Sequence, residues 1–114
     1  MKLNENGLKN RNEWEEKGYE VPKYDRQEMI KRTKENPCWV HFGAGNIFRA
    51  FHADIAEKLL NEGITDKGIT VVEGYDYEII EKKYHPNDDY SITAVLKSDG
   101  SVDKKVVGLS LIHI

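Results

Sequence analysis

The residues best suited to do chemistry surround two glycines in the middle of the chain. Gly43 and Gly45, separated by Ala44, follow an apolar run and precede a stretch with helical periodicity. In a strand–turn–helix unit, the first glycine permits the tight turn and the second leaves room for an anion beside the backbone. The N–H groups at the start of the helix face that anion, and Asn46 and Ile47 can add backbone donors. We therefore expect residues 43–47 to bind the diphosphate of a dinucleotide.

Glu73 supplies the second half of this pattern. It follows a second apolar run, where an acidic side chain can accept hydrogen bonds from the ribose hydroxyls of a dinucleotide. A 2′-phosphate would meet its negative charge, which favours NAD over NADP. The alternative is that Glu73 simply faces solvent as the strand leaves the sheet. Phe48 replaces the third glycine of the usual motif, which serves helix–strand packing, so the motif is weaker but still usable.

The other reactive side chains near the turn have less defined roles. Arg49 can neutralise the pyrophosphate or a substrate carboxylate, or it is an ordinary exposed helix arginine. Asn46 can cap the helix through its side chain. His41 and His52 lack ligand spacing, so we expect packed or surface histidines rather than a metal site. Cys38 has no C-x-x-C mate, and we expect an inert core thiol. No residue is assigned a catalytic role.

A βαβ unit is needed to bring these residues together. Residues 38–42 and 69–72 have the composition of buried strands. Between them a helix should run from Asn46 to near Glu62, with Gly63 as its stop. A right-handed crossover makes the two strands parallel. We therefore predict an α/β fold, a partial Rossmann-like, doubly wound dinucleotide-binding domain. The apolar positions Ile47, Phe51, Ile55 and Leu59 recur every four residues. With Phe48, Ala56 and Leu60 beside them they form one broad apolar stripe.

The two ends of the chain differ from this middle part. Residues 1–36 are polar and mixed in charge, and we expect an arm with a short helix over 26–34. Residues 37–108 would form the partial NAD-binding domain. Residues 109–114 change character abruptly, and we expect a non-native or truncated tail there.

The second half of the domain has two local signals. Residues 77–83 can form a short helix. Residues 90–96 alternate with period two, and Asp99-Gly100 is a strong turn signal, so we predict a β-hairpin with 102–107 as the partner strand.

The composition and the charge pattern exclude several classes of protein. The chain has 114 residues, with 17 Lys+Arg against 20 Asp+Glu and a formal net charge of -3, which fits one domain. Charges of both signs are interspersed, so we expect no binding to nucleic acid or anionic lipid. No apolar run is long enough to span a membrane, and the start lacks the apolar stretch of a secretion signal. A single cysteine excludes an internal disulfide, so we expect a cytoplasmic protein.

The segment around the glycine turn resembles a known family. Residues 39–51, WVHFGAGNIFRAF, are similar to the N-terminal signature of the mannitol dehydrogenase family of polyol and hexuronate dehydrogenases, including fructuronate reductase. The resemblance implies a zinc-independent enzyme that moves hydride between a nicotinamide cofactor and a polyol or hexuronate. The family's catalytic lysine lies in a later, mostly helical domain. The resemblance therefore implies that this chain lacks the catalytic residues and has the missing C-terminal domain as its partner.

Other functions share the same local pattern. A non-catalytic nucleotide-sensing module would use the turn to bind NAD(H) or another adenine nucleotide. An S-adenosylmethionine-dependent methyltransferase also has a glycine turn after its first strand and an acid after its second. Alternatively, the glycines serve only the turn.

The doubly wound order also predicts a weakness. The strand that would pair with the outer side of residues 39–42 is absent, which leaves an open apolar edge. We therefore expect a marginally folded chain without enzymatic turnover.

Overall fold

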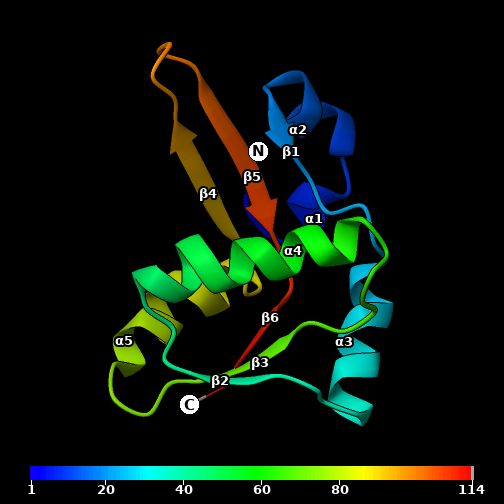
Figure 1. Ribbon diagram of the computed structural model, residues 1–114, viewed down its shortest axis with the longest axis vertical. Helices are drawn as coiled ribbons and strands as arrows, with labels where there is room; N and C mark the ends of the chain where they lie inside the picture. Colours follow the sequence, from blue (N-terminus) through cyan, green and yellow to red (C-terminus); the bar gives the residue numbers. More distant parts are fainter. Residues whose placement is uncertain (114) are drawn as a thin grey trace.

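The computed structural model describes residues 1–113, which form two three-stranded sheets with helices packed around them (Figure 1). The first sheet is parallel, in the order β2-β3-β6. The second has the order β1-β5-β4, with β4 antiparallel and β1 parallel to β5. The strands are β1 (Tyr19–Glu20), β2 (Val40–Phe42), β3 (Ile69–Val72), β4 (Ser91–Leu96), β5 (Val102–Val107) and β6 (Ser110–His113).

The parallel sheet contains the predicted βαβ unit. β2 leads through the glycine turn into a continuous helix, made of the wider π-helical turns of η1 (Phe48–His52) followed by α4 (Ala53–Asn61), and the chain returns to β3. Gly63 ends the helix at φ +73°, and its N–H donates to Leu60 O at 3.1 Å. The order β6-β3-β2 is that of strands three, two and one of a doubly wound sheet. The predicted α/β, Rossmann-like class is confirmed.

The helix buries only part of the broad apolar stripe that the sequence predicted. Ile47, Phe51 and Ile55 are exposed, Ile47 by 76%. A strict four-residue repeat advances about 40° per step around an α-helix, so it drifts off any single face, whereas mixed spacings of three and four do not. Of the predicted stripe, Phe48, Ala56 and Leu60 enter the core, together with Ala53.

β2 is an exposed edge strand and not the buried strand that the apolar run predicted. Val40 and Phe42 are exposed, Phe42 by 78%, and Cys38 is an exposed thiol rather than a core one. Within residues 1–113, β2 pairs only with β3, so one of its edges has no strand partner. The described part of the chain therefore has the expected open apolar edge.

The structure places the end of the domain differently from the sequence analysis. β6 pairs in parallel with β3, with Ser110 opposite Ile69 and Ile112 opposite Val71, and Leu109 is fully buried. A short apolar run after a glycine is also the pattern of a buried parallel strand, and here it forms the third strand of the sheet. Ile114 lies outside the described residues. That residues 109–114 are non-native stays a prediction.

The N-terminal arm is built into the second sheet through β1. The arm carries α1 (Glu5–Leu8), α2 (Arg11–Glu16) and α3 (Arg26–Glu35). α3 begins as predicted, because the Asp25 carboxylate accepts a hydrogen bond from the Glu28 N–H at 3.2 Å and caps the helix. A second small core lies between the arm and the hairpin sheet, formed by Leu8, Trp14, Val21, Tyr90 and Val106.

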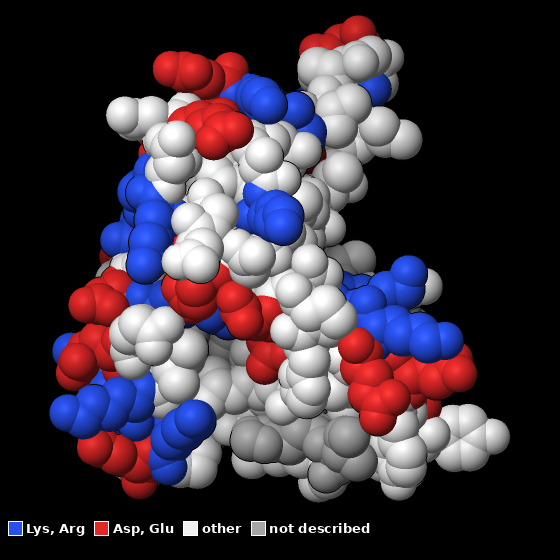
Figure 2. Space-filling model, turned by 180° about the vertical axis from the view of Figure 1, so that it is seen from behind, with Lys and Arg blue, Asp and Glu red and all other residues white. Residues whose placement is uncertain are grey.

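The segment between the two sheets is helical, as predicted for residues 77–83, and continues further. It comprises α5 (Tyr77–Ile79), η2 (Ile80–Tyr84) and η3 (His85–Asn87). The predicted hairpin follows, and its far end stands clear of the body in Figure 1. Figure 2 shows acidic and basic side chains interspersed on the opposite face, in keeping with the alternating charges of the sequence. No helix within residues 1–113 is long and apolar enough to cross a membrane.

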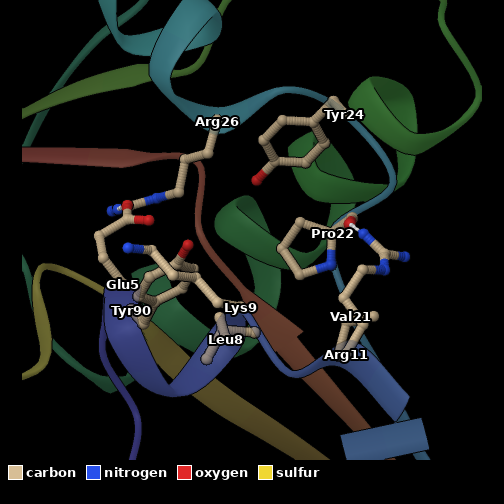
Figure 3. A pocket seen from close by; sticks show the side chains of 9 residues that line it. All are labelled: Glu5, Leu8, Lys9, Arg11, Val21, Pro22, Tyr24, Arg26 and Tyr90. Carbon is tan, nitrogen blue, oxygen red and sulfur yellow. Dashed lines mark hydrogen bonds and ion pairs between the residues drawn. The ribbon is translucent and has the colours of Figure 1, made fainter.

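A buried arginine joins the arm to both sheets (Figure 3). Arg26, only 8% exposed, donates from Nε to Gly108 O at 2.7 Å and from Nη2 to Asp88 O at 2.5 Å, and it pairs with Glu5. Its guanidinium lies 3.9 Å from the centre of the Tyr90 ring. Arg26, Glu5 and Tyr90 border a cavity of about 130 Å³. Because Gly108 connects β5 to β6, Arg26 fixes the joint between the sheets.

A buried carboxylate holds the same joint from α4. Glu57 is fully buried, and its Oε1 accepts hydrogen bonds from the Tyr24 hydroxyl at 2.6 Å and from the Gly108 N–H at 3.0 Å. Burial raises the pKa of Glu57 to about 7, against the opposing effect of these two hydrogen bonds. Burial also raises the pKa of Tyr24, which therefore stays a donor. The joint thus contains a carboxyl group that titrates near neutral pH.

We predict that Glu57 makes the chain less stable as the pH rises. Its pKa is 4.5 when unfolded and about 7 when folded, so the folded state binds the extra proton between these values. The stabilisation is complete below pH 4.5 and is lost as the pH passes 7, a change of about 3 kcal/mol. Urea unfolding across this range should show the trend in the wild type and lose it in Glu57→Gln. Glu62→Gln, at the exposed end of the same helix, should keep it. Identical pH profiles for the wild type and Glu57→Gln would contradict this prediction.

Candidate functional site

The glycine turn lies at the carboxyl edge of the parallel sheet. Gly43 has φ +103°, a conformation that favours glycine, and its N–H donates to Val72 O at the end of β3 at 2.8 Å. The first helical hydrogen bond, from Arg49 N–H to Gly45 O, measures 3.1 Å. The chain therefore passes from the end of β2 directly into a helix, as the motif requires.

The carbonyl groups of the turn all have partners within the protein. Gly43 O lies 2.9 Å from His41 Nδ1, which must donate because a carbonyl oxygen only accepts. Ala44 O accepts from the Tyr84 hydroxyl at 2.8 Å, and Gly45 O accepts from Arg49 N–H. The first N–H groups of a helix have no acceptor within the helix. The turn thus directs its acceptors into the protein and leaves the helix N–H groups for an anion.

The space beside Gly45 is open. A Cβ built on Gly45 would have no heavy atom within 4 Å, whereas Ala44, the residue between the glycines, is fully buried. The Ile47 side chain points to solvent, and its backbone lies in the first helical turn. Residues 43–47 therefore combine open space with helix N–H groups, and diphosphate binding by them stays a prediction.

Glu73 directly follows β3 and reaches the glycine turn that follows β2. Its Oε1 accepts from the Ala44 N–H at 2.9 Å, and its Oε2 accepts from the Tyr75 and Asp76 N–H groups, each at 3.2 Å. These hydrogen bonds, led by that from Ala44, lower the pKa of Glu73. The carboxylate is thus attached to the glycine turn and does not simply point to solvent. Ribose binding by Glu73 stays a prediction.

Arg49 folds back along the turn. Its Nη1 lies 3.4 Å from Ala44 O and 3.5 Å from the Tyr84 hydroxyl, and its Nη2 donates to Asn46 Oδ1. The Asn46 side chain is therefore engaged with Arg49, in the first helical turn, rather than with the helix backbone as a cap. Next to Arg49 is a cavity of about 230 Å³, lined by Arg49, Asp76, Glu78, Ile79, Lys82 and Lys83. The arginine is close enough to meet an anion at the turn.

The structure also joins residues that the sequence left separate. The rings of His41 and His52 are 4.9 Å apart, and His52 contacts Trp39 and Phe51 edge-on. Among residues 1–113, no group of three side chains is placed to bind a metal ion. Tyr84 is a site residue that sequence reasoning missed. Its sequence signal is weak, because Tyr84 lies one residue beyond the helix predicted over 77–83, four residues after the apolar Ile80.

The fold and the site together indicate a class of protein. A parallel βαβ unit with a glycine turn into a helix, and an acid after the second strand, is the arrangement of a dinucleotide-binding α/β domain.

Comparisons with known proteins agree with this class. No family model matches the chain. D-mannonate oxidoreductase of Thermotoga maritima is 48% identical over 107 residues, which cover 94% of this chain and 20% of that protein. The structure of D-sorbitol dehydrogenase in substrate-free form has a TM-score of 0.64 at 26% identity, covering 83% of this chain and 19% of that one. Pseudomonas fluorescens mannitol 2-dehydrogenase, in a ternary complex with NAD and D-mannitol, has a TM-score of 0.74 at 19% identity, covering 98% and 22%, a likeness of fold alone.

These likenesses confirm the resemblance seen at the glycine turn. They relate the chain to the mannitol dehydrogenase family, and it spans about a fifth of the length of the relatives that it matches.

The contacts of Glu73 predict a shared titration. The amide protons of Ala44, Tyr75 and Asp76 should shift together in NMR spectra as the pH falls, with one midpoint below 4.5, because all three donate to the same carboxylate. In Glu73→Gln this common transition should vanish. Separate midpoints for the three amides, or a transition that persists in the variant, would show that Glu73 does not hold the turn.

Proposed function

We propose that this chain is the NAD-binding portion of an oxidoreductase that transfers hydride between a nicotinamide cofactor and a polyol or hexuronate. The observation that carries the proposal is the glycine turn, whose carbonyl groups all face protein donors while Glu73 reaches it from the next strand. The similarity to D-mannonate oxidoreductase supports the class of reaction.

Each site residue has a binding role in this proposal. The backbone of residues 43–47 holds the diphosphate, with Arg49 neutralising part of its charge. Glu73 accepts hydrogen bonds from the ribose, and its charge disfavours the 2′-phosphate of NADP. The bound nicotinamide supplies the hydride chemistry. The residues of this chain bind and orient it.

Catalysis itself is assigned to residues outside this chain. The family resemblance places the catalytic lysine in a later domain, which we propose as the partner of this one within a longer protein. The name of the relative from Thermotoga maritima refers to a sugar acid, which favours a hexuronate-type substrate over an uncharged polyol. We further propose a cytoplasmic location, where an exposed free thiol such as Cys38 stays reduced.

Binding measurements separate this proposal from its alternatives. NADH should bind the chain, NADPH should bind about ten-fold more weakly or worse, and S-adenosylmethionine should not compete. Gly45→Val should abolish NADH binding, because its side chain would occupy the open space beside the turn. Ala50→Val, at an exposed position of η1, should bind NADH normally. Preference for S-adenosylmethionine would favour a methyltransferase. Unchanged NADH binding by Gly45→Val would show that the glycines only shape the turn and do not contact the cofactor.

An activity assay separates a cofactor domain from a complete enzyme. The purified chain, supplied with NAD and either D-mannonate or D-mannitol, should not reduce the nicotinamide, because it lacks the proposed catalytic domain. The longer protein is the control. Turnover by the chain alone would show that it contains its own catalytic residues.

A further inference from the structure

Tyr84 contacts the glycine turn from a segment far away in sequence. Its ring is 1% exposed and belongs to the main core, and its hydroxyl donates to Ala44 O at 2.8 Å. Burial raises the pKa of Tyr84, so the phenol stays protonated and can donate. η2 therefore places a hydrogen-bond donor against the Ala44 carbonyl, on the side of the turn that faces the core.

Because the peptide bond is planar, this hydrogen bond also fixes the direction of the N–H group of the same peptide. In a trans peptide, the C=O and the following N–H point in opposite directions. With Ala44 O directed at the buried hydroxyl, the Gly45 N–H must point away from the core, toward the open space beside Gly45.

The preceding peptide is fixed in the same manner by other residues. Gly43 O is paired with His41, and the Ala44 N–H is paired with Glu73. The peptide between Ala44 and Gly45 has instead Tyr84 as its close partner, while Arg49 contacts the same oxygen at a longer 3.4 Å. The orientation of this one peptide therefore depends chiefly on the tyrosine hydroxyl.

We propose that Tyr84 is a positioning residue that sets the orientation of the Ala44–Gly45 peptide and so aims the Gly45 N–H at a nucleotide diphosphate. This inference rests on the proposed function and adds a residue outside the glycine motif to it. Without the hydroxyl, Ala44 O would be a buried acceptor that loses its closest donor, and rotation of the peptide would relieve this. Such a rotation would turn the Gly45 N–H away from the anion.

The test compares two buried tyrosines. Tyr84→Phe keeps the ring and removes only the hydroxyl, and Tyr90→Phe does the same in the second core, which is separate from the core that contains the turn. NADH affinity should fall about three- to ten-fold in Tyr84→Phe and stay unchanged in Tyr90→Phe. The Gly45 amide resonance should also move in Tyr84→Phe without any ligand, a change that a loss of packing in the second core does not produce.

The outcomes distinguish the inference from the proposed function. Wild-type affinity in Tyr84→Phe, or an unmoved Gly45 resonance, overturns the inference and leaves the function standing. Equal losses of affinity in both variants also overturn it, because they indicate a general effect of stability. Failure of the wild type to bind NADH overturns the proposed function, and with it the role given to Tyr84.

Discussion

The site depends on one constraint, which is that a backbone turn can receive an anion only if its carbonyl oxygens point elsewhere. In this chain three different donors meet that constraint, from β2, from the helix that follows the turn and from η2. The same turn is tied to the end of β3 by Glu73. The proposed anion binding at this edge therefore depends on tertiary contacts as much as on the two glycines.

A second set of contacts keeps the helix of the site in place. α4 continues from the glycine turn, and Glu57 in its middle bonds to Gly108, the link between the two sheets. Arg26 bonds to the carbonyl of the same glycine. A Cβ on Gly108 would lie 2.6 Å from the Tyr90 ring, so the joint tolerates only glycine without rearrangement. The N-terminal arm, the hairpin sheet and the parallel sheet are thus linked at Gly108.

The sequence predicted the local parts of this architecture and missed the parts that depend on distant contacts. The glycine turn, the acid after β3, the cap at Asp25 and the hairpin all follow from a few neighbouring residues. The predicted stripe of the helix was too broad, because the members of its four-residue repeat at Ile47, Phe51 and Ile55 are exposed and only its other side is buried. β2 was taken for a buried strand from its apolar composition, although the doubly wound order already predicted that one of its edges would be open. Tyr84 reaches the turn across 40 positions, a contact that no local pattern encodes.

The most direct measurement of the central claim is an NMR titration of the labelled chain with NADH. The account predicts that the largest amide shifts fall on residues 44–47 and on the turn after Glu73, at the carboxyl edge of the parallel sheet. Shifts concentrated instead around the cavity lined by the arm and Tyr90 (Figure 3), or an absence of shifts at the glycine turn, would contradict it.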